Sequence, residues 1–183
     1  MLNTDGAVKT TLGLGGRGGV IQNHRGDWII GFISREAHIN PILVEIRALR
    51  QGFLMSMEFK THPLDINTDS MIHLLEHESH PYTNLISECR SLIEKLGTTM
   101  PTHIFREQNK VSDMLSKECL KCNIFGKLTY LIVSPLFAKD ATWTEISGTM
   151  YSRKLYPNII SVIVHTTTKN SNYATTSSIF ASN

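Results

Sequence analysis

The sequence predicts an α/β protein in which one mixed sheet carries helices on both faces. Three observations lead to this class. Residues 1–36 contain β-rich runs with a glycine turn, the hydrophobic period becomes helical after residue 40, and strand-like and helix-like runs then alternate. Consecutive strands predict antiparallel pairing, whereas strands separated by helices predict parallel crossovers, so the sheet is expected to be mixed.

Three strands are predicted at the start of the chain. They are read in "MLNT", "GGVIQNH" and "DWIIGFISR", and Gly26 in "HRGDW" supplies the turn between the last two. The run "GLGGRGG" lacks the GK[ST] ending and the following helix of a phosphate loop. It is therefore predicted to be a flexible turn that leads into the second strand.

A long helix is predicted next, because apolar residues then follow helical spacing: Leu43, Ile46, Leu49, Phe53, Leu54 and Met57. Asn40 and Pro41 form a plausible cap and first-turn pair. A short strand is predicted in "HPLDINTDS". Two helices then follow, in "SMIHLLEH" with Ser70 as the cap and in "YTNLISECRSLIEKLG" ending at Gly97.

A fifth strand, "MPTHIFRE", and a last helix, "NKVSDMLSKECL" capped by Asn109, complete the predicted order βββαβααβα. Composition changes after residue 120. We therefore expect a domain over residues 1–120, an extension over 121–155 with one apolar run, and a tail over 156–183. The tail is rich in Ser, Thr and Asn and is expected to be poorly ordered.

Length and composition fit one domain with an appendage. The chain has 183 residues, 41% of them hydrophobic, and a net charge of +2, which permits a nucleic-acid partner without the basic stripe of a dedicated binder. Three cysteines without a regular framework favour a reducing compartment. No signal peptide or membrane-spanning run is seen, so we expect a soluble, intracellular monomer in the nucleus or cytoplasm, without a membrane partner.

Four carboxylates lie where a strand stops or a helix starts: Asp5, Glu45, Asp69 and Asp113. In open α/β sheets, sites form at these places. Four converging carboxylates repel one another unless they bind cations, and Mg²⁺ prefers such hard oxygen ligands. Two ions ~4 Å apart would clamp the attacking and leaving oxygens of a phosphodiester.

Each acid also has an ordinary structural interpretation. Asp5 can be an acid in a turn beside glycine, and Asp69 can be an acid at a helix start that complements the helix dipole. Glu45 can be a solvated residue on a helix surface. Asp113 has Lys110 and Lys117 at helical spacing and fits an ion pair. The set as a whole, rather than any one member, favours a site.

The motifs "LNTDGA", "VEIRAL", "INTDS" and "HIFREQNKVSDMLSK" resemble those of the type 1 ribonuclease H family, in particular the plant branch related to reverse-transcriptase polyproteins of non-LTR retrotransposons. The resemblance covers residues 1 to about 120. It implies a five-stranded mixed sheet in the order 3-2-1-4-5. It also implies that Asp5, Glu45, Asp69 and Asp113 bind two Mg²⁺ ions, with Mn²⁺ able to substitute. His103 then corresponds to the histidine that aids proton transfer or product departure.

The implied activity is endonucleolytic hydrolysis of the RNA strand of an RNA–DNA hybrid. Relative to the family, the first strand is short and the chain is expected to be truncated at its start, which would impair catalysis. Two alternatives stay open: a non-catalytic nucleic-acid-binding remnant of a retrotransposon, and another enzyme of the same fold, such as an exonuclease.

Other candidates are weaker. Cys119 and Cys122 form a C-x-x-C without a second pair for zinc, and are read as incidental at a fraying helix end. His73 and His77 have metal-pair spacing but no evident third ligand. The basic residues read as surface charges able to touch phosphates are Arg47, Arg50, Lys60 and Arg106.

Overall fold

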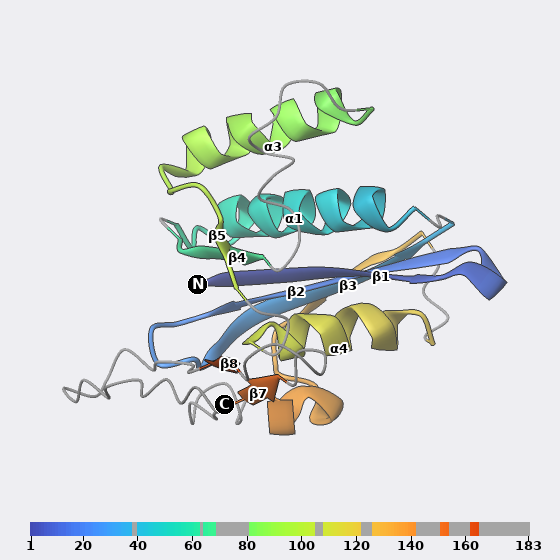
Figure 1. Ribbon diagram of the computed structural model, residues 1–183. Coiled ribbons are helices and arrows are strands. Elements are labelled where there is room, and N and C mark those ends of the chain that lie inside the picture. Colours follow the sequence, from blue (N-terminus) through green and yellow to red (C-terminus); the bar gives the residue numbers. More distant parts are fainter. Residues whose placement is uncertain are drawn as a thin grey trace, which may run out of the picture.

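The computed structural model describes residues 1–37, 40–62, 64–68, 81–104, 108–121, 126–141, 151–153 and 162–164. A mixed sheet lies between α1 and α3 on one face and α4 on the other (Figure 1). The strands of this sheet are β1 (Leu2–Lys9), β2 (Leu14–Gln22), β3 (Trp28–Glu36), β4 (Ile66–Thr68), β5 (Thr102–His103) and β6 (Leu128–Leu131). The α-helices are α1 (Pro41–Glu58), α3 (Thr83–Leu96) and α4 (Lys110–Cys119).

The sheet has the order β5-β4-β1-β2-β3-β6. β2 is antiparallel to β1 and to β3, whereas β4 is parallel to β1 and to β5. The predicted fold class and the order 3-2-1-4-5 are therefore confirmed. The strand count needs a correction, because β6 adds a sixth strand antiparallel to β3. The Trp28 indole N–H donates to the Leu131 carbonyl oxygen at 3.0 Å and fastens this edge.

Two expectations for the opening of the chain were wrong. β1 runs through Gly6 to Lys9 and is therefore not a short strand of four residues. The glycine-rich run is not a flexible turn, because β2 starts at Leu14 and contains Gly15, Gly16, Gly18 and Gly19. The turn itself is the short 3-10 helix η1 (Thr10–Leu12), followed by Gly13 at φ 63°.

Close packing of α4 explains the glycines of β2. A Cβ at Gly18 would lie 2.4 Å from the Ser116 amide nitrogen, and one at Gly16 would lie 2.2 Å from the Ser116 carbonyl oxygen. Any side chain at these positions would push the helix off the strand. Gly16 and Gly18 thus form a floor on which α4 lies.

The helix ends follow the predicted signals in two cases out of three. Asn40 caps α1, and its Oδ1 accepts from the Leu43 amide at 3.1 Å; Gly97 ends α3 at φ 60°. Asn109 precedes α4, but its side chain does not cap the helix. Its Nδ2 instead donates to the Thr4 carbonyl oxygen on β1 at 2.8 Å, so it joins helix and sheet. The helix predicted in "SMIHLLEH", with Ser70, lies outside the described residues.

Two apolar clusters fill the two sides of the sheet. The larger one packs α1 onto the sheet and α3 onto α1, and its members include Phe32, Phe53 and Ile86. The smaller one packs α4 through Val20, Leu115 and neighbours. Each large side chain buried in this way stabilises the fold by about 1.5–3 kcal/mol.

The described cysteines belong to these cores. Cys89 and Cys119 are fully buried, so Cys119 is a packed residue rather than part of a frayed helix end. Burial raises the pKa of the Cys89 thiol to about 12, which keeps it protonated and unreactive. Cys122, His73 and His77 lie outside the described residues.

The C-terminal part contributes β6, the 3-10 helix η3 (Leu136–Ala138), and a separate antiparallel pair of β7 (Tyr151–Arg153) and β8 (Val162–Val164). The remaining residues of the predicted tail lie outside the described ones, and the boundaries at 120 and 155 stay predictions. In the part of the chain that the structure describes, no helix is both long and apolar enough to cross a membrane.

We predict that Gly18→Ala destabilises the protein by about 1–3 kcal/mol, as overpacking of a tight interior typically does. Its new methyl group would meet backbone and Cβ atoms of α4, at 2.4 Å from the Ser116 nitrogen and 2.6 Å from the Leu115 Cβ. Urea unfolding measures the change. Gly13→Asn is the control, because among the described residues no atom beyond its two chain neighbours lies within 4 Å of a Cβ built there, and asparagine tolerates positive φ. Equal stability of Gly18→Ala and the wild type would refute the close contact.

Candidate active site

Asp5 lies on the central strand β1 and points toward α4. It is only 2% exposed, and its Oδ2 accepts a hydrogen bond from the hydroxyl of Ser116 in the middle of α4. Its partner across the sheet is Gly18, which has no side chain to occupy the same space. The carboxylate is therefore held between β1 and α4 rather than in a surface turn.

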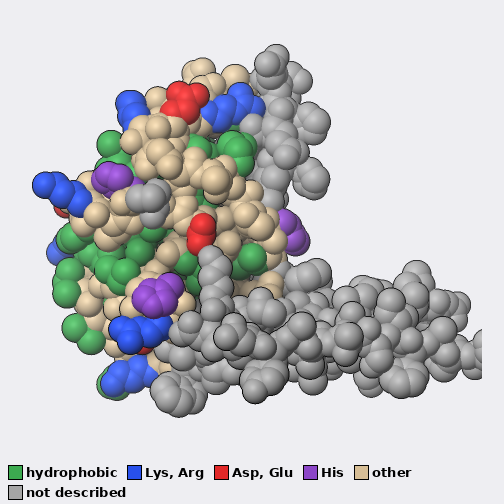
Figure 2. Space-filling view, turned by 90° about the vertical axis from the view of Figure 1, so that its left-hand side faces the viewer, with side chains coloured by type: hydrophobic (Ala, Val, Ile, Leu, Met, Phe, Trp, Pro, Cys, Tyr) green, Lys and Arg blue, Asp and Glu red, His purple; other side chains and the backbone are tan. Residues whose placement is uncertain are grey.

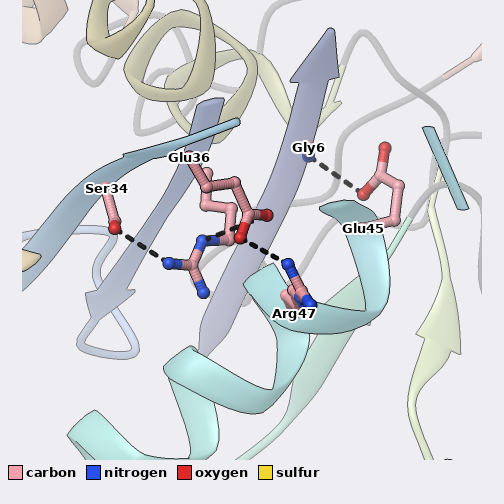
Figure 3. A network of polar contacts seen from close by, with 6 residues as sticks. Gly6, Ser34, Glu36, Glu45 and Arg47 are labelled. Carbon is pink, nitrogen blue, oxygen red and sulfur yellow. Dashed lines mark hydrogen bonds and ion pairs between the residues drawn. The ribbon is translucent and has the colours of Figure 1, made fainter. Parts of the chain in front are cut away.

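Glu45 reaches the same strand from the opposite face of the sheet. Its Oε2 accepts a hydrogen bond from the Gly6 amide at 3.0 Å, as Figure 3 shows. This approach requires glycine, because a Cβ at Gly6 would lie 2.8 Å from the Glu45 nitrogen. In the Asp5–Gly6 dipeptide, the Asp5 carboxylate thus points toward α4, and the Gly6 amide binds the Glu45 carboxylate of α1.

Asp113 lies in the first turn of α4. Its carboxylate pairs with Lys117 at 2.6 Å, so the ion pair suggested by the i, i+4 spacing is formed. Its carbonyl oxygen lies 2.9 Å from the Ser116 hydroxyl, which also donates to Asp5. Ser116 thereby links the Asp5 carboxylate to the backbone of Asp113, not to its carboxylate.

Of the other two predicted site residues, His103 belongs to the β4–β5 edge. Parallel pairing places Asn67 beside Asn3 of β1, and β4 ends at Thr68. Asp69, the next residue in the sequence, lies outside the described residues. His103 is exposed on β5 and pairs with Thr68. The structure thus places His103 beside the end of β4.

The donor chemistry of the described acids fits a divalent cation. Asp5, Glu45 and Asp113 offer hard carboxylate oxygens, which Mg²⁺ prefers. Among the described residues, no three His, Cys, Asp or Glu side chains form a group that could hold a metal ion. Asp5, Glu45 and Asp113 therefore do not form such a group by themselves, and the fourth predicted acid, Asp69, lies outside the described residues.

A network of charges borders the Gly6–Glu45 contact (Figure 3). The Glu36 carboxylate accepts from Arg47 at 2.7 Å and lies 3.7 Å from Arg17, which donates to Ser34 at 2.9 Å. Burial lowers the pKa of Arg17, although Glu36 acts in the opposite direction. The network ties the start of α1 to β2 and β3, and so fixes the helix that carries Glu45.

The predicted phosphate-contacting residues are partly engaged within the protein. Arg47 pairs with Glu36, and Arg50 pairs with Glu88 at 2.6 Å. Arg106 lies outside the described residues. On the face seen in Figure 2, the described basic side chains form small separate groups rather than one stripe. This distribution agrees with the net charge of +2.

Sequence reasoning missed the residues that hold the acids in place. Ser116, Asn109 as a tie to β1, and the Arg17–Glu36–Arg47 network carry no motif of their own. The one signal in the sequence was the glycine spacing of β2, which marks a close backbone approach as well as a turn.

This sheet order, with helices on both faces, defines a ribonuclease H-like fold, and solved structures agree. The N-terminal ribonuclease H domain of a Mycobacterium tuberculosis protein, solved as a maltose-binding-protein fusion, aligns with a TM-score of 0.60 at 16% identity, covering 66% of this chain and 91% of that one. Ribonuclease H1 of Halobacterium salinarum aligns with a TM-score of 0.61 at 19% identity, covering 66% and 96%. A third, LC11 ribonuclease H1 solved with an RNA/DNA hybrid, gives 0.56 at 17% identity, covering 64% and 93%.

The chain belongs to the family described as reverse transcriptase-like, whose profile matches residues 3–119. A curated Arabidopsis thaliana relative, whose name marks it as a candidate ribonuclease H protein, is 28% identical over 120 residues. The match covers 63% of this chain and 19% of that relative. The ribonuclease H resemblance is thereby confirmed.

We predict that Glu36→Gln lowers the free energy of unfolding by about 2 kcal/mol, because it leaves two half-buried arginines without a carboxylate. Glu88→Gln is the matched control. It breaks the more exposed pair with Arg50 and should cost less than about 1 kcal/mol. Urea unfolding compares both variants with the wild type. Equal losses for the two variants would show that the Glu36 network contributes no more than a surface pair.

Proposed function

We propose that this protein hydrolyses the RNA strand of RNA–DNA hybrids endonucleolytically, with Mg²⁺ as the cofactor. The observation that carries the proposal is the junction at Asp5–Gly6, where a buried carboxylate on β1 adjoins an amide bound by Glu45 of α1. All four proposed ligands, and His103, fall inside the region matched by the family.

Asp5, Glu45, Asp69 and Asp113 are the residues proposed to hold two Mg²⁺ ions, and Mn²⁺ is proposed to substitute. Asp69 directly follows β4 in the sequence, and β4 is the parallel neighbour of the strand that carries Asp5, which supports Asp69 as a member. The chemistry that such ions supply when bound is activation of a water and stabilisation of the leaving 3′ oxygen.

The chain's own residues orient these ligands and move protons. The Gly6 amide orients the Glu45 carboxylate, and the Ser116 hydroxyl orients that of Asp5. His103 is exposed on β5, where its imidazole can move a proton during product departure. The proposed products carry 5′-phosphate and 3′-hydroxyl ends.

The proposed substrate is an RNA–DNA hybrid, with RNA read through its 2′-hydroxyl groups across the minor groove. A monomer in the nucleus or cytoplasm, derived from a plant retrotransposon, completes the proposal. The Arabidopsis relative supports the plant origin.

We predict that Asp5→Asn and Asp69→Asn abolish Mg²⁺-dependent cleavage, because an amide keeps the shape of the carboxylate but removes its charge. Glu45→Gln should follow closely, Asp113→Asn should be intermediate, and His103→Ala should be mildest. Proton transfer contributes ~10²–10⁴-fold at most, and water partly replaces it. The measurement is cleavage of a labelled RNA strand in a hybrid, with Mg²⁺ against EDTA.

An all-DNA duplex is the control for strand specificity. Undiminished activity of Asp69→Asn would end the two-metal proposal. A folded wild type with no cleavage would favour the alternative of a catalytically impaired, nucleic-acid-binding remnant. The motivations of this alternative are a first strand with only four residues before Gly6 and the drifted tail; β1 itself continues past Gly6 to Lys9.

A further inference from the structure

We propose that Ser116 is a positioning residue that holds the Asp5 carboxylate for metal binding. The inference rests on the proposed function, and no motif of the sequence pointed to it. Its basis is the hydrogen bond that the Ser116 hydroxyl donates to Asp5 Oδ2, inside the packed junction of α4 and the sheet.

The backbone of Ser116 has little freedom to move. The residue is fully buried, and its nitrogen and carbonyl oxygen lie against Gly18 and Gly16 of β2. Gly18 is also the partner of Asp5 across the sheet. The glycine floor therefore fixes the distance between the serine hydroxyl and the strand that carries the carboxylate.

The chemistry of the hydroxyl suits this role. A serine hydroxyl has one proton to donate, and a hydrogen bond to a carboxylate is stronger than one to a neutral acceptor. A carboxylate offers about four lone-pair directions, and the bond from Ser116 uses one of them. The bond thus selects one orientation of Asp5 without consuming its capacity as a ligand.

A second acceptor lies within reach of the same hydroxyl. It is the backbone carbonyl oxygen of Asp113, 2.9 Å away and one turn earlier in α4, so the single hydroxyl proton is shared between this oxygen and Asp5 Oδ2. Asn109 adds a second tie between α4 and β1 through Thr4. Ser116 therefore couples the position of Asp5 to the first turn of α4, where Asp113 lies.

Ser112 provides a matched control on the same helix. It is fully buried like Ser116, and its hydroxyl makes no hydrogen bond among the described residues. Ser112→Ala therefore removes the same atom from the same helix without touching Asp5. Ser116→Cys keeps a side chain of similar shape but replaces the donor with a weak one.

The experiment measures Mg²⁺ binding rather than cleavage. The full chain is labelled with ¹⁵N and titrated with MgCl₂ at constant pH and ionic strength, and the Gly6 amide signal beside the two acids reports binding. We expect Ser116→Ala to raise the apparent Kd for Mg²⁺ at least about 10-fold, as loss of a ligand's hydrogen-bond partner typically costs 10–100-fold. Ser112→Ala should match the wild type.

Three results would overturn the inference. An unchanged Kd in Ser116→Ala, with a wild type that binds Mg²⁺, would remove the role of Ser116 and leave the proposed function standing. An equal rise in Ser112→Ala would assign the effect to packing. A wild type without any Mg²⁺-dependent shift would contradict the proposed function itself. If Ser116→Ala does not fold, titration of Ser116→Cys distinguishes the same outcomes.

Discussion

The close approach of α4 to β2 is the constraint on which the rest of the structure depends. It exists because Gly16 and Gly18 leave room for the backbone of Ser116. In this position, Ser116 donates a hydrogen bond to Asp5, and Asn109, the residue before α4, donates one to the Thr4 carbonyl oxygen. These two hydrogen bonds to the central strand β1 depend on the absence of side chains at Gly16 and Gly18. Gly6 plays the same part on the other face, where it admits the start of α1 and the Glu45 carboxylate.

Much of the fold could be predicted from local signals. Asn40 and Pro41 start α1 where expected, Gly97 ends α3, and the alternation of strands and helices gives the parallel pairing of β1, β4 and β5. The misses have physical causes. Glycines mark both turns and close approaches of the backbone, so the glycine run of β2 also fits a turn. The edge strand β6 has four residues and depends on its pairing with β3, which no local pattern reveals.

The candidate site also has a part that could be predicted from the sequence and a part that could not. Glu45 and Asp113 lie near helix starts as expected, whereas Asp5 lies inside β1 rather than where a strand stops. The groups that orient them are not predictable, because they depend on contacts between residues far apart in the chain. Ser116 contacts Asp5 across 111 positions, and Asn109 contacts Thr4 across 105. Asn109 also shows that a helix-capping residue type is diverted when a buried strand carbonyl lies within reach.

The central claim is that the Asp5–Gly6 junction is a metal site at which an RNA–DNA hybrid is cleaved. The most direct measurement is anomalous diffraction from crystals of the chain grown with Mn²⁺ and a hybrid. We expect Mn²⁺ peaks bounded by the carboxylates of Asp5 and Glu45, with the scissile phosphate of the RNA strand beside them. A hybrid bound elsewhere on the protein, with no Mn²⁺ peak at Asp5, would contradict the account.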